Sequence, residues 1–341
     1  MAAILEVEGL VKKFGQFSAV KGISFSVERG EVFGLLGPNG AGKTTIISML
    51  TGTSPPTSGT ARIGGYDLAS DPLPVKRLIG LVPQELALYP TLSARANLNF
   101  FGGVYGLRGA ELKSRVEDVL AVVALSERAD EPIEKYSGGM KRRANIAAGL
   151  VHQPELLFLD EPTVGVDPQS RNHIFESVLK LNHERGMTII YTSHYMEEVE
   201  LLCNRVAIID QGQIIALDTI KNLVGMLGGG VLHVGLRSQD ESLLGQIAAL
   251  PAVSSAVRLS TASQVEPAGP LVGDGNDGAA GIALPESDVL PVKIECEHSQ
   301  QALIHLIRFL NGCDINIASL EILEPNLESV FLHLTGKKLR E

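Results

Sequence analysis

Two kinds of hydrophobic pattern alternate in the first part of the chain. Residues 4–8, 18–20 and 23–27 alternate apolar and polar positions, which is typical of strands with one buried face. Other runs are apolar along most of their length, as in parallel strands covered on both faces, and they lie at 31–36, 79–82, 156–159 and 187–192. With a closing hairpin over 206–216, the pattern predicts an α/β domain in which a small antiparallel sheet precedes a parallel one.

The pattern changes between about residue 91 and residue 152. Helical patterns cover 92–105 and 111–125, and a further helix over 141–152 ends before Pro154. Because these helices interrupt the series of strands, we expect a helical subdomain inserted into the α/β domain.

A second domain is predicted after Gly228-Gly-Gly230. Residues 231–341 contain two successive β-α-β patterns, which indicate a small ferredoxin-like α+β domain. Between them, about 261–288, the sequence is rich in Gly and Pro and its only charges are acidic, so we expect a flexible loop. The predicted domains are therefore 1–228 and 231–341.

A glycine-rich loop lies between the strand at 31–36 and the helix that follows. It matches G-x-x-x-x-G-K-[ST] in full. Glycines let several backbone N–H groups face one anion, and a helix N-terminus adds donors and partial positive charge. Lys43 brings a full charge to the outer phosphates, and the Thr44 hydroxyl can ligate Mg²⁺. A plain glycine-rich turn is the alternative, but the strand before the loop and the helix after it favour a nucleotide site. The predicted site consists of Gly37, Pro38, Asn39, Gly40, Ala41, Gly42, Lys43, Thr44 and Thr45.

Polar residues follow the ends of the other predicted strands. Asp160 and Glu161 come directly after the most apolar strand, where two carboxylates need a cation or a catalytic role. Asp160 is predicted to hold Mg²⁺, and Glu161 to take a proton from an attacking water. Gln84 and His194 follow two further strands, at the sheet edge where open α/β proteins bind ligands. A solvated loop glutamine and a structural histidine are the alternatives.

Two weaker signals complete the candidate chemistry. Phe14 lies in a polar turn, where it can either stack on a flat base or fold back onto the small sheet. Ser137, Gly138 and Gly139 precede a helix, an arrangement that suits an anion but also an ordinary helix cap.

Composition narrows the class of protein. A chain of 341 residues is long enough for two domains, and its 45% hydrophobic content suits a folded core. The net charge of −10, without a long Lys/Arg cluster, argues against nucleic acid. Without an 18-residue apolar stretch or a signal-like N-terminus, we expect a cytoplasmic protein. Cys203, Cys296 and Cys313 are too far apart for a zinc site or a disulfide framework, so we expect reduced thiols.

The order and spacing of these motifs resemble the ATP-binding cassette (ABC) ATPases. The resemblance covers about residues 3–228, and Ser137-Gly-Gly139 together with the other motifs is its most specific part. The C-terminal stretch 324–336 is similar to the tail of exporter-type cassettes of the multidrug, antibiotic-resistance and sodium-efflux group. Met140 and Val166 replace the commoner Gln and Leu of the family, but neither change removes a polar group that would touch phosphate.

The resemblance implies an ATPase that powers a membrane exporter. Phe14 would stack on adenine, the loop 37–45 would hold ATP and Mg²⁺, and Gln84 would sense the γ-phosphate and ligate the metal. His194 would contact the same phosphate. Ser137, Gly138 and Gly139 would act on ATP held by a second copy in a head-to-tail dimer. A separate transmembrane permease would dock around Gln84 and hold the protein at the cytoplasmic face of the membrane.

Other functions stay open at this point. A soluble cassette ATPase in translation or DNA repair is one, although the chain has neither a second cassette nor a coiled coil or zinc hook. An importer subunit and a regulatory module with an inactive nucleotide site are the others, and Glu161 and His194 speak against the inactive module.

Overall fold

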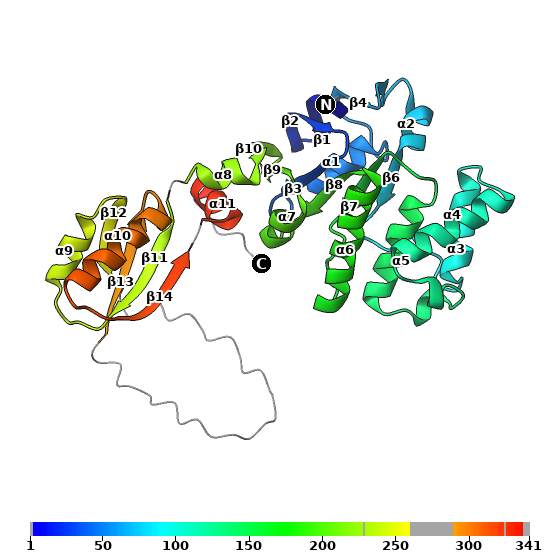
Figure 1. Ribbon diagram of the computed structural model, residues 1–341. Helices are drawn as coiled ribbons and strands as arrows, with labels where there is room; N and C mark the ends of the chain where they lie inside the picture. The colour runs from blue at the N-terminus through cyan, green and yellow to red at the C-terminus, as the bar shows by residue number, and fades with distance from the viewer. Residues whose placement is uncertain (1–2, 228, 260–288, 324, 337–341) are drawn as a thin grey trace, which may run out of the picture. The chain divides into compact units, whose positions relative to one another are not determined.

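The computed structural model describes residues 3–227, 229–259, 289–323 and 325–336, and its chain divides into two compact units. Unit 1 comprises Met1–Leu223 with Phe331–Glu341, and unit 2 comprises Val224–Val330 (Figure 1). The predicted loop at about 261–288 lies outside the described residues.

A four-stranded antiparallel sheet begins unit 1. Its strands, in the order β2-β1-β4-β5, are β2 (Phe17–Glu28), β1 (Ala3–Phe14), β4 (Ser58–Ile63) and β5 (Tyr66–Asp67). The predicted strands at 18–20 and 23–27 are one long strand, because β2 continues through Gly22, whose φ of 84° is readily adopted only by glycine. Phe14 and Phe17 face each other across the tight turn that joins β1 to β2.

The central sheet of unit 1 has six strands. In spatial order they are β10 (Gln213–Thr219), β9 (Arg205–Asp210), β3 (Val32–Leu36), β8 (Thr188–Ser193), β7 (Leu156–Asp160) and β6 (Ile79–Val82). From β9 to β6 the strands are parallel, whereas β10 pairs antiparallel with β9. All residues of β3, β7 and β8 are buried, as their unbroken apolar runs predict.

One hydrophobic core joins the two sheets of unit 1. Phe25 of β2 stacks on Phe33 of β3, with ring centroids 5.3 Å apart and planes within 1° of parallel. Ile46 and Leu50 of α1 (Lys43–Leu50) are fully buried in the same core. Since burying such a side chain stabilises a fold by about 1.5–3 kcal/mol, this packing fixes the glycine loop that precedes α1.

The helical subdomain forms a separate lobe beside the central sheet (Figure 1). It contains α3 (Ala94–Val104), α4 (Gly109–Val122), η1 (Ser126–Arg128), η2 (Ile133–Lys135) and α5 (Gly138–Leu150). The remaining helices of the first 225 residues are α2 (Pro72–Leu78), α6 (Pro168–Arg185), α7 (Met196–Leu202) and α8 (Ile220–Gly225). Helix α6 begins with Asp167 as its cap and Pro168 in its first turn, and it ends at Gly186, whose φ is 61°.

Unit 2 is a ferredoxin-like sandwich. Its antiparallel sheet has the order β12-β13-β11-β14, formed by β12 (Val253–Arg258), β13 (Leu290–Cys296), β11 (Val231–Leu236) and β14 (Ile317–Leu323). The core side chains of this sheet pack with α9 (Ser242–Ala248) and α10 (Ser299–Gly312). The chain then continues into α11 (Leu327–Thr335). Together, the two units confirm the predicted fold class.

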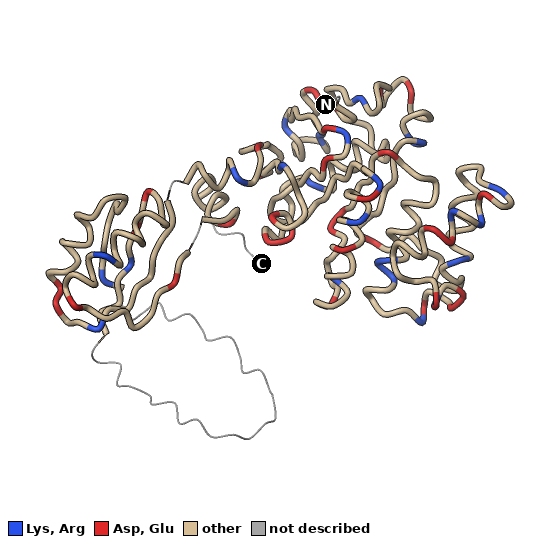
Figure 2. The backbone as a smooth tube through the Cα atoms, viewed as in Figure 1, with Lys and Arg blue, Asp and Glu red and all other residues tan. Residues whose placement is uncertain are grey.

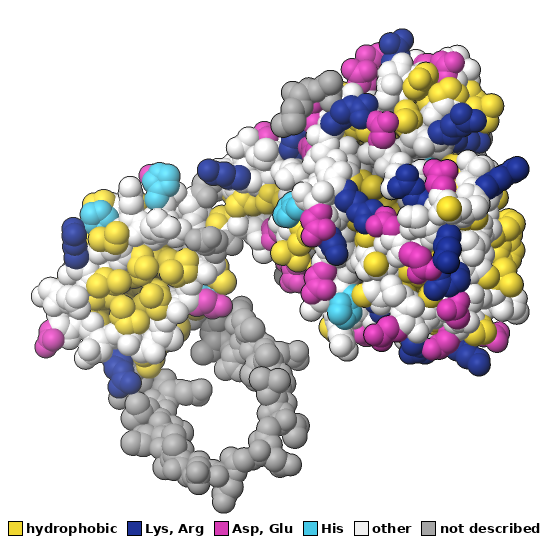
Figure 3. Space-filling model, turned by 45° about the vertical axis from the view of Figure 1, so that its right-hand side comes forward, with side chains coloured by type: hydrophobic (Ala, Val, Ile, Leu, Met, Phe, Trp, Pro, Cys, Tyr) yellow, Lys and Arg dark blue, Asp and Glu magenta, His cyan; other side chains and the backbone are white. Residues whose placement is uncertain are grey.

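Charged residues of both signs are interspersed along the chain of unit 1 (Figure 2). On unit 2, hydrophobic side chains gather on one face (Figure 3), and Ile304, Ile307, Leu320 and Ile322 are among its exposed apolar residues. No helix in the described part of the chain is both long and apolar enough to cross a membrane. All three cysteines are free, and Cys203 and Cys296 are buried.

Candidate active site

Residues from distant parts of the sequence line one cleft of about 560 Å³ in unit 1. They come from the β1–β2 hairpin, from the glycine loop and the first turn of α1, and from three loops that follow strands of the central sheet. The lining residues are Phe14, Phe17, Ala19, Asn39, Gly40, Gly42, Lys43, Thr44, Thr45, Gln84, Glu161, Val164 and His194.

The glycine loop needs its glycines for conformation and for space. Gly40 and Gly42 have φ of 80° and 111°, and a Cβ on Gly37 would lie 2.3 Å from the carbonyl oxygen of Ile209. Gly37, Pro38 and Ala41 do not line the cleft; the carbonyl oxygens of Gly37 and Pro38 accept hydrogen bonds from Lys43 Nζ at 2.7 and 3.2 Å. The first N–H groups of α1 have no partner within the helix, so the loop ends in donors.

Asp160 occupies the last position of β7, where it is 3% exposed. Its Oδ1 accepts hydrogen bonds from the Thr192 hydroxyl at 2.8 Å and from the Thr44 hydroxyl at 3.3 Å. Burial raises the pKa of the Asp160 carboxyl above its ordinary value, and these hydroxyl hydrogen bonds oppose that rise. Carboxylate and hydroxyl oxygens are the ligands that Mg²⁺ takes alongside phosphate oxygens, so Thr44 and Asp160 fit this metal.

Glu161 has a backbone conformation that is unusual for its residue type. Its φ is 45°, in the left-handed region, and its N–H donates to the Thr192 hydroxyl at 2.8 Å. Its carboxylate Oε1 lies 3.0 Å from Lys43 Nζ, and both side chains are buried. Oε2 lies 3.4 Å from His194 Nδ1, which makes no hydrogen bond within the described residues. The strained loop thus places one carboxylate between a lysine and an imidazole.

Two exposed aromatic rings line the cleft. Phe14 and Phe17 are 55% and 68% exposed, so Phe14 does not fold back onto the small sheet. Lys12 Nζ lies 5.1 Å from the centroid of the Phe14 ring. Sequence reasoning missed Phe17, although its place opposite Phe14 in a hairpin was a usable signal.

Ser137, Gly138 and Gly139 do not line the cleft. Ser137 is exposed and caps α5, its hydroxyl accepting the N–H of Met140 at 3.2 Å. Gly139 is buried against α6, where an added Cβ would lie 2.0 Å from the Ser170 hydroxyl oxygen. Within one chain, these three residues therefore lie beside the turn at Asp167. The predicted residues that do line the cleft are Phe14, Gln84, Glu161, His194 and the loop residues named above.

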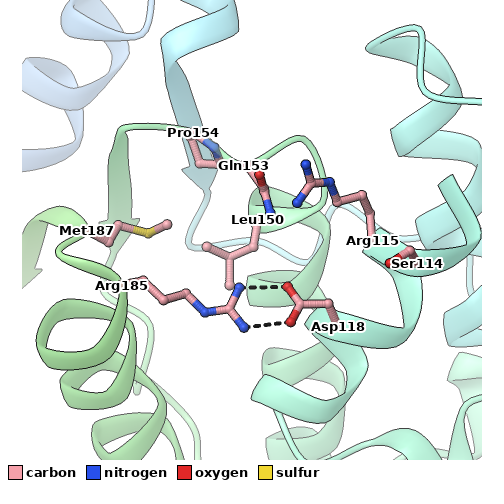
Figure 4. Close-up of a pocket in the computed structure, with 8 residues that line it drawn as sticks. All are labelled: Ser114, Arg115, Asp118, Leu150, Gln153, Pro154, Arg185 and Met187. Carbon is pink, nitrogen blue, oxygen red and sulfur yellow. Dashed lines mark hydrogen bonds and ion pairs between the residues drawn. The ribbon is translucent and has the colours of Figure 1, made fainter. Parts of the chain in front are cut away.

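A second cleft, of about 580 Å³, separates α4 from the ends of α5 and α6. Figure 4 shows Arg185 of α6 and Asp118 of α4 facing each other across it, joined by two hydrogen bonds of 2.7 Å. The guanidinium beside Asp118 lowers the pKa of that carboxyl. Because this ion pair joins α4 of the helical subdomain to α6, we interpret its role as holding these helices together and not as binding a ligand.

Comparison with known proteins decides the family. A family model described as "ABC transporter" matches residues 20–164. The linearmycin resistance ATP-binding protein LnrL of Bacillus subtilis (strain 168) is 47% identical over 339 residues, which cover 99% of this chain and 100% of that protein. The chain belongs to the ABC transporter family.

Further relatives agree with this assignment. The Nod factor export ATP-binding protein I of Ralstonia nicotianae (strain ATCC BAA-1114 / GMI1000) is 36% identical over 340 residues. These residues cover 99% of this chain and 95% of that protein. The dimeric post-hydrolysis cassette MJ0796 bound to ADP and Pi is 27% identical with a TM-score of 0.57, covering 63% of this chain and 98% of that one. This chain is thus an ATP-hydrolysing ABC subunit of the exporter type, and the translation, repair and importer alternatives are disfavoured. The relatives are ATP-binding subunits of transporters and the MJ0796 cassette is a dimer, which points to a permease partner and to dimerisation for this chain as well.

Proposed function

We propose that this ABC subunit powers the efflux of an antibiotic through a separate permease. The observation that carries the proposal is the 47% identity to a linearmycin resistance protein along 99% of the chain, both units included. The antibiotic itself would be selected by the permease, which alone crosses the membrane. The subunit would then lie at the cytoplasmic face, held there by that partner.

The nucleotide would bind with its base near Phe14 and its phosphates at the glycine loop. Phe14 offers an exposed ring for stacking, and the N-terminal donors of α1 together with Lys43 suit a polyphosphate. Thr44 and Asp160 would hold Mg²⁺, with Gln84 as a further oxygen donor. When bound, the metal would neutralise phosphate charge.

Glu161 would act as the general base of hydrolysis. Its backbone is strained, its carboxylate pairs with Lys43 in the nucleotide-free chain, and it lines the same cleft as the phosphate-binding loop. His194 lies beside it, where an imidazole can donate to the γ-phosphate. A positioned base contributes typically 10²- to 10⁴-fold to a rate.

The active site would be completed by a second copy of this chain. Ser137 and Gly138 are exposed at the start of α5, and their helix N-terminus is suited to phosphate. Because they lie outside the cleft of their own chain, they would reach ATP only in a head-to-tail dimer. ATP would hold two copies together, and hydrolysis would release them.

The permease would dock on exposed apolar residues around α3. Tyr89 packs edge-on against Phe100, with ring centroids 5.2 Å apart, yet these rings remain 47% and 47% exposed. Leu86, Leu92 and Val104 add exposed apolar area in the same part of the chain. This apolar surface begins two residues after Gln84, so a permease docked there would be close to the nucleotide site.

Two experiments test the proposal. The chain is purified from membranes of its host, and a permease that co-purifies is identified by mass spectrometry. Cells carrying Lys43→Ala should then lose antibiotic resistance, and the purified variant should lose ATP binding, whereas Lys113→Ala on the exposed face of α4 should change neither. Normal ATP affinity in Lys43→Ala would refute the loop's role, and unchanged resistance with abolished ATPase activity would refute efflux.

A further inference from the structure

One buried carboxylate ties together the two loops that carry Glu161 and His194. Glu198 of α7 is only 2% exposed. Its Oε2 accepts hydrogen bonds from the hydroxyls of Thr163 at 2.9 Å and Ser193 at 2.9 Å. Tyr191 donates a third, at 3.0 Å. A buried carboxylate is costly unless it is hydrogen-bonded, so this cluster of hydroxyls offsets the cost of placing Glu198 there.

The donors are adjacent in sequence to the catalytic candidates. Thr163 follows Glu161 with only Pro162 between them, and the proline ring restricts the backbone of that link. Ser193 directly precedes His194, and its hydroxyl oxygen also accepts the N–H of Tyr195 at 2.9 Å. One oxygen of Glu198 therefore holds the loop just after Glu161, through Thr163, and the loop just before His194, through Ser193.

We infer that Glu198 is a positioning residue for hydrolysis, which keeps the carboxylate of Glu161 and the imidazole of His194 in register with each other. The inference rests on the proposed roles of those two residues. Glu198 itself does not line the cleft. Its loss should let the two loops move independently, and a displacement of about 1 Å from productive geometry can cost about 10²-fold in rate.

The three groups that donate to Glu198 are all hydroxyls, and they need an oxygen acceptor at this position. Burial raises the pKa of the Tyr191 phenol well above its ordinary value, as does the adjacent Glu198 carboxylate, so Tyr191 keeps its proton. The Glu198 Oε1 atom has no hydrogen-bond partner among the described residues. Glu198→Gln can therefore turn its carbonyl oxygen to the three hydroxyls and its amide to the other side, whereas Glu198→Ala leaves all three without their acceptor.

The test compares steady-state ATPase kinetics of full-length variants. Glu198→Ala should lower kcat roughly 10- to 100-fold while the KM for ATP changes by less than about 3-fold, and Glu198→Gln should recover most of the loss. Glu197→Gln, on the same helix but exposed, is the matched control and should keep full activity. Should Glu198→Ala fold poorly, Thr163→Val and Ser193→Ala each remove one donor with little change in volume, and each should lower kcat without raising KM.

The outcomes separate this inference from the proposed function. Wild-type kcat in Glu198→Ala, or in both single-donor variants, overturns it. A parallel loss of kcat and ATP affinity also overturns it, because that pattern indicates general damage to the fold. If instead Glu161→Gln keeps full activity, the assignment of Glu161 as the base fails. Glu198→Ala is then still judged by its own kinetics: equal effects on kcat and on KM contradict a positioning role.

Discussion

Lys43 Nζ and Glu161 Oε1 lie 3.0 Å apart, with their side chains only 4% and 7% exposed. This buried pair joins the residue expected to bind phosphate to the residue expected to activate water. Removing the charge of Glu161 should free Lys43 for a phosphate. A bound polyphosphate competes for the same ammonium, so ATP binding should loosen the pair and release the carboxylate for catalysis.

Glu161→Gln should therefore bind ATP at least as tightly as the parent but hydrolyse it roughly 10²- to 10⁴-fold more slowly. The physical reason is that an amide cannot take a proton from water at neutral pH, and its neutral carbonyl oxygen holds Lys43 less strongly than the carboxylate does, which leaves the ammonium to the phosphates. Equilibrium binding of a fluorescent ATP analogue and single-turnover hydrolysis measure the two effects separately. Weaker binding together with unchanged turnover would contradict both parts of the prediction.

Gly139→Ala should destabilise the chain by about 1–3 kcal/mol, the usual cost of overpacking a filled site. The added Cβ would lie 2.0 Å from Ser170 Oγ and 2.1 Å from Ser170 Cβ, whereas a Cβ on Gly138 would have only the Gly165 carbonyl oxygen within reach, at 3.8 Å. Thermal unfolding should thus separate Gly139→Ala from Gly138→Ala. Adding Ser170→Gly should restore much of the lost stability; if it does not, the clash is not the cause.

The sequence predicted those parts of the fold and site that depend on local patterns. Apolar runs located the buried strands, and the loop from Gly37 to Thr45 could be placed because its glycines have a fixed spacing. The short helix α7 was missed, since seven residues give too little periodicity to be distinguished from a loop. Its Glu198 and the Thr192 hydroxyl bond to residues that only the folded sheet brings close, so no local pattern could reveal them.

His152 should make stability fall at acid pH. Its Nε2 bonds the Ile79 carbonyl oxygen at 2.8 Å, its ring lies 3.6 Å from that of Tyr105 with planes within 4°, and burial lowers its pKa below the ordinary 6.5. A base whose pKa is depressed by folding contributes stability that is present above its unfolded pKa and is lost as pH falls through the folded one. His152→Phe, which keeps an aromatic ring but does not titrate, should flatten the decline in Tm below about pH 6.5.

The exposed His183 provides the control, because His183→Gln removes an imidazole that is not enclosed by the fold. Its Tm should follow the parent's across the same pH series. An equally steep decline in His152→Phe and the parent would show that other groups govern acid unfolding.

Asp160→Asn should raise the Tm of the nucleotide-free chain while abolishing activation by Mg²⁺. Burial raises the pKa of the Asp160 carboxyl from its ordinary 3.8, so its contribution to stability is fully present below that value and is lost as pH rises through the folded pKa. Asparagine keeps an acceptor for the Thr192 and Thr44 hydroxyls and carries no charge. The gain in Tm over the parent should therefore grow with pH and then level off, as followed by calorimetry without nucleotide. Hydrolysis of ATP by the variant should no longer respond to Mg²⁺, because Asp160 is the carboxylate proposed to hold the metal. A lower Tm at every pH would mean that the Asp160 charge stabilises the nucleotide-free site, which is the reverse of what its burial predicts.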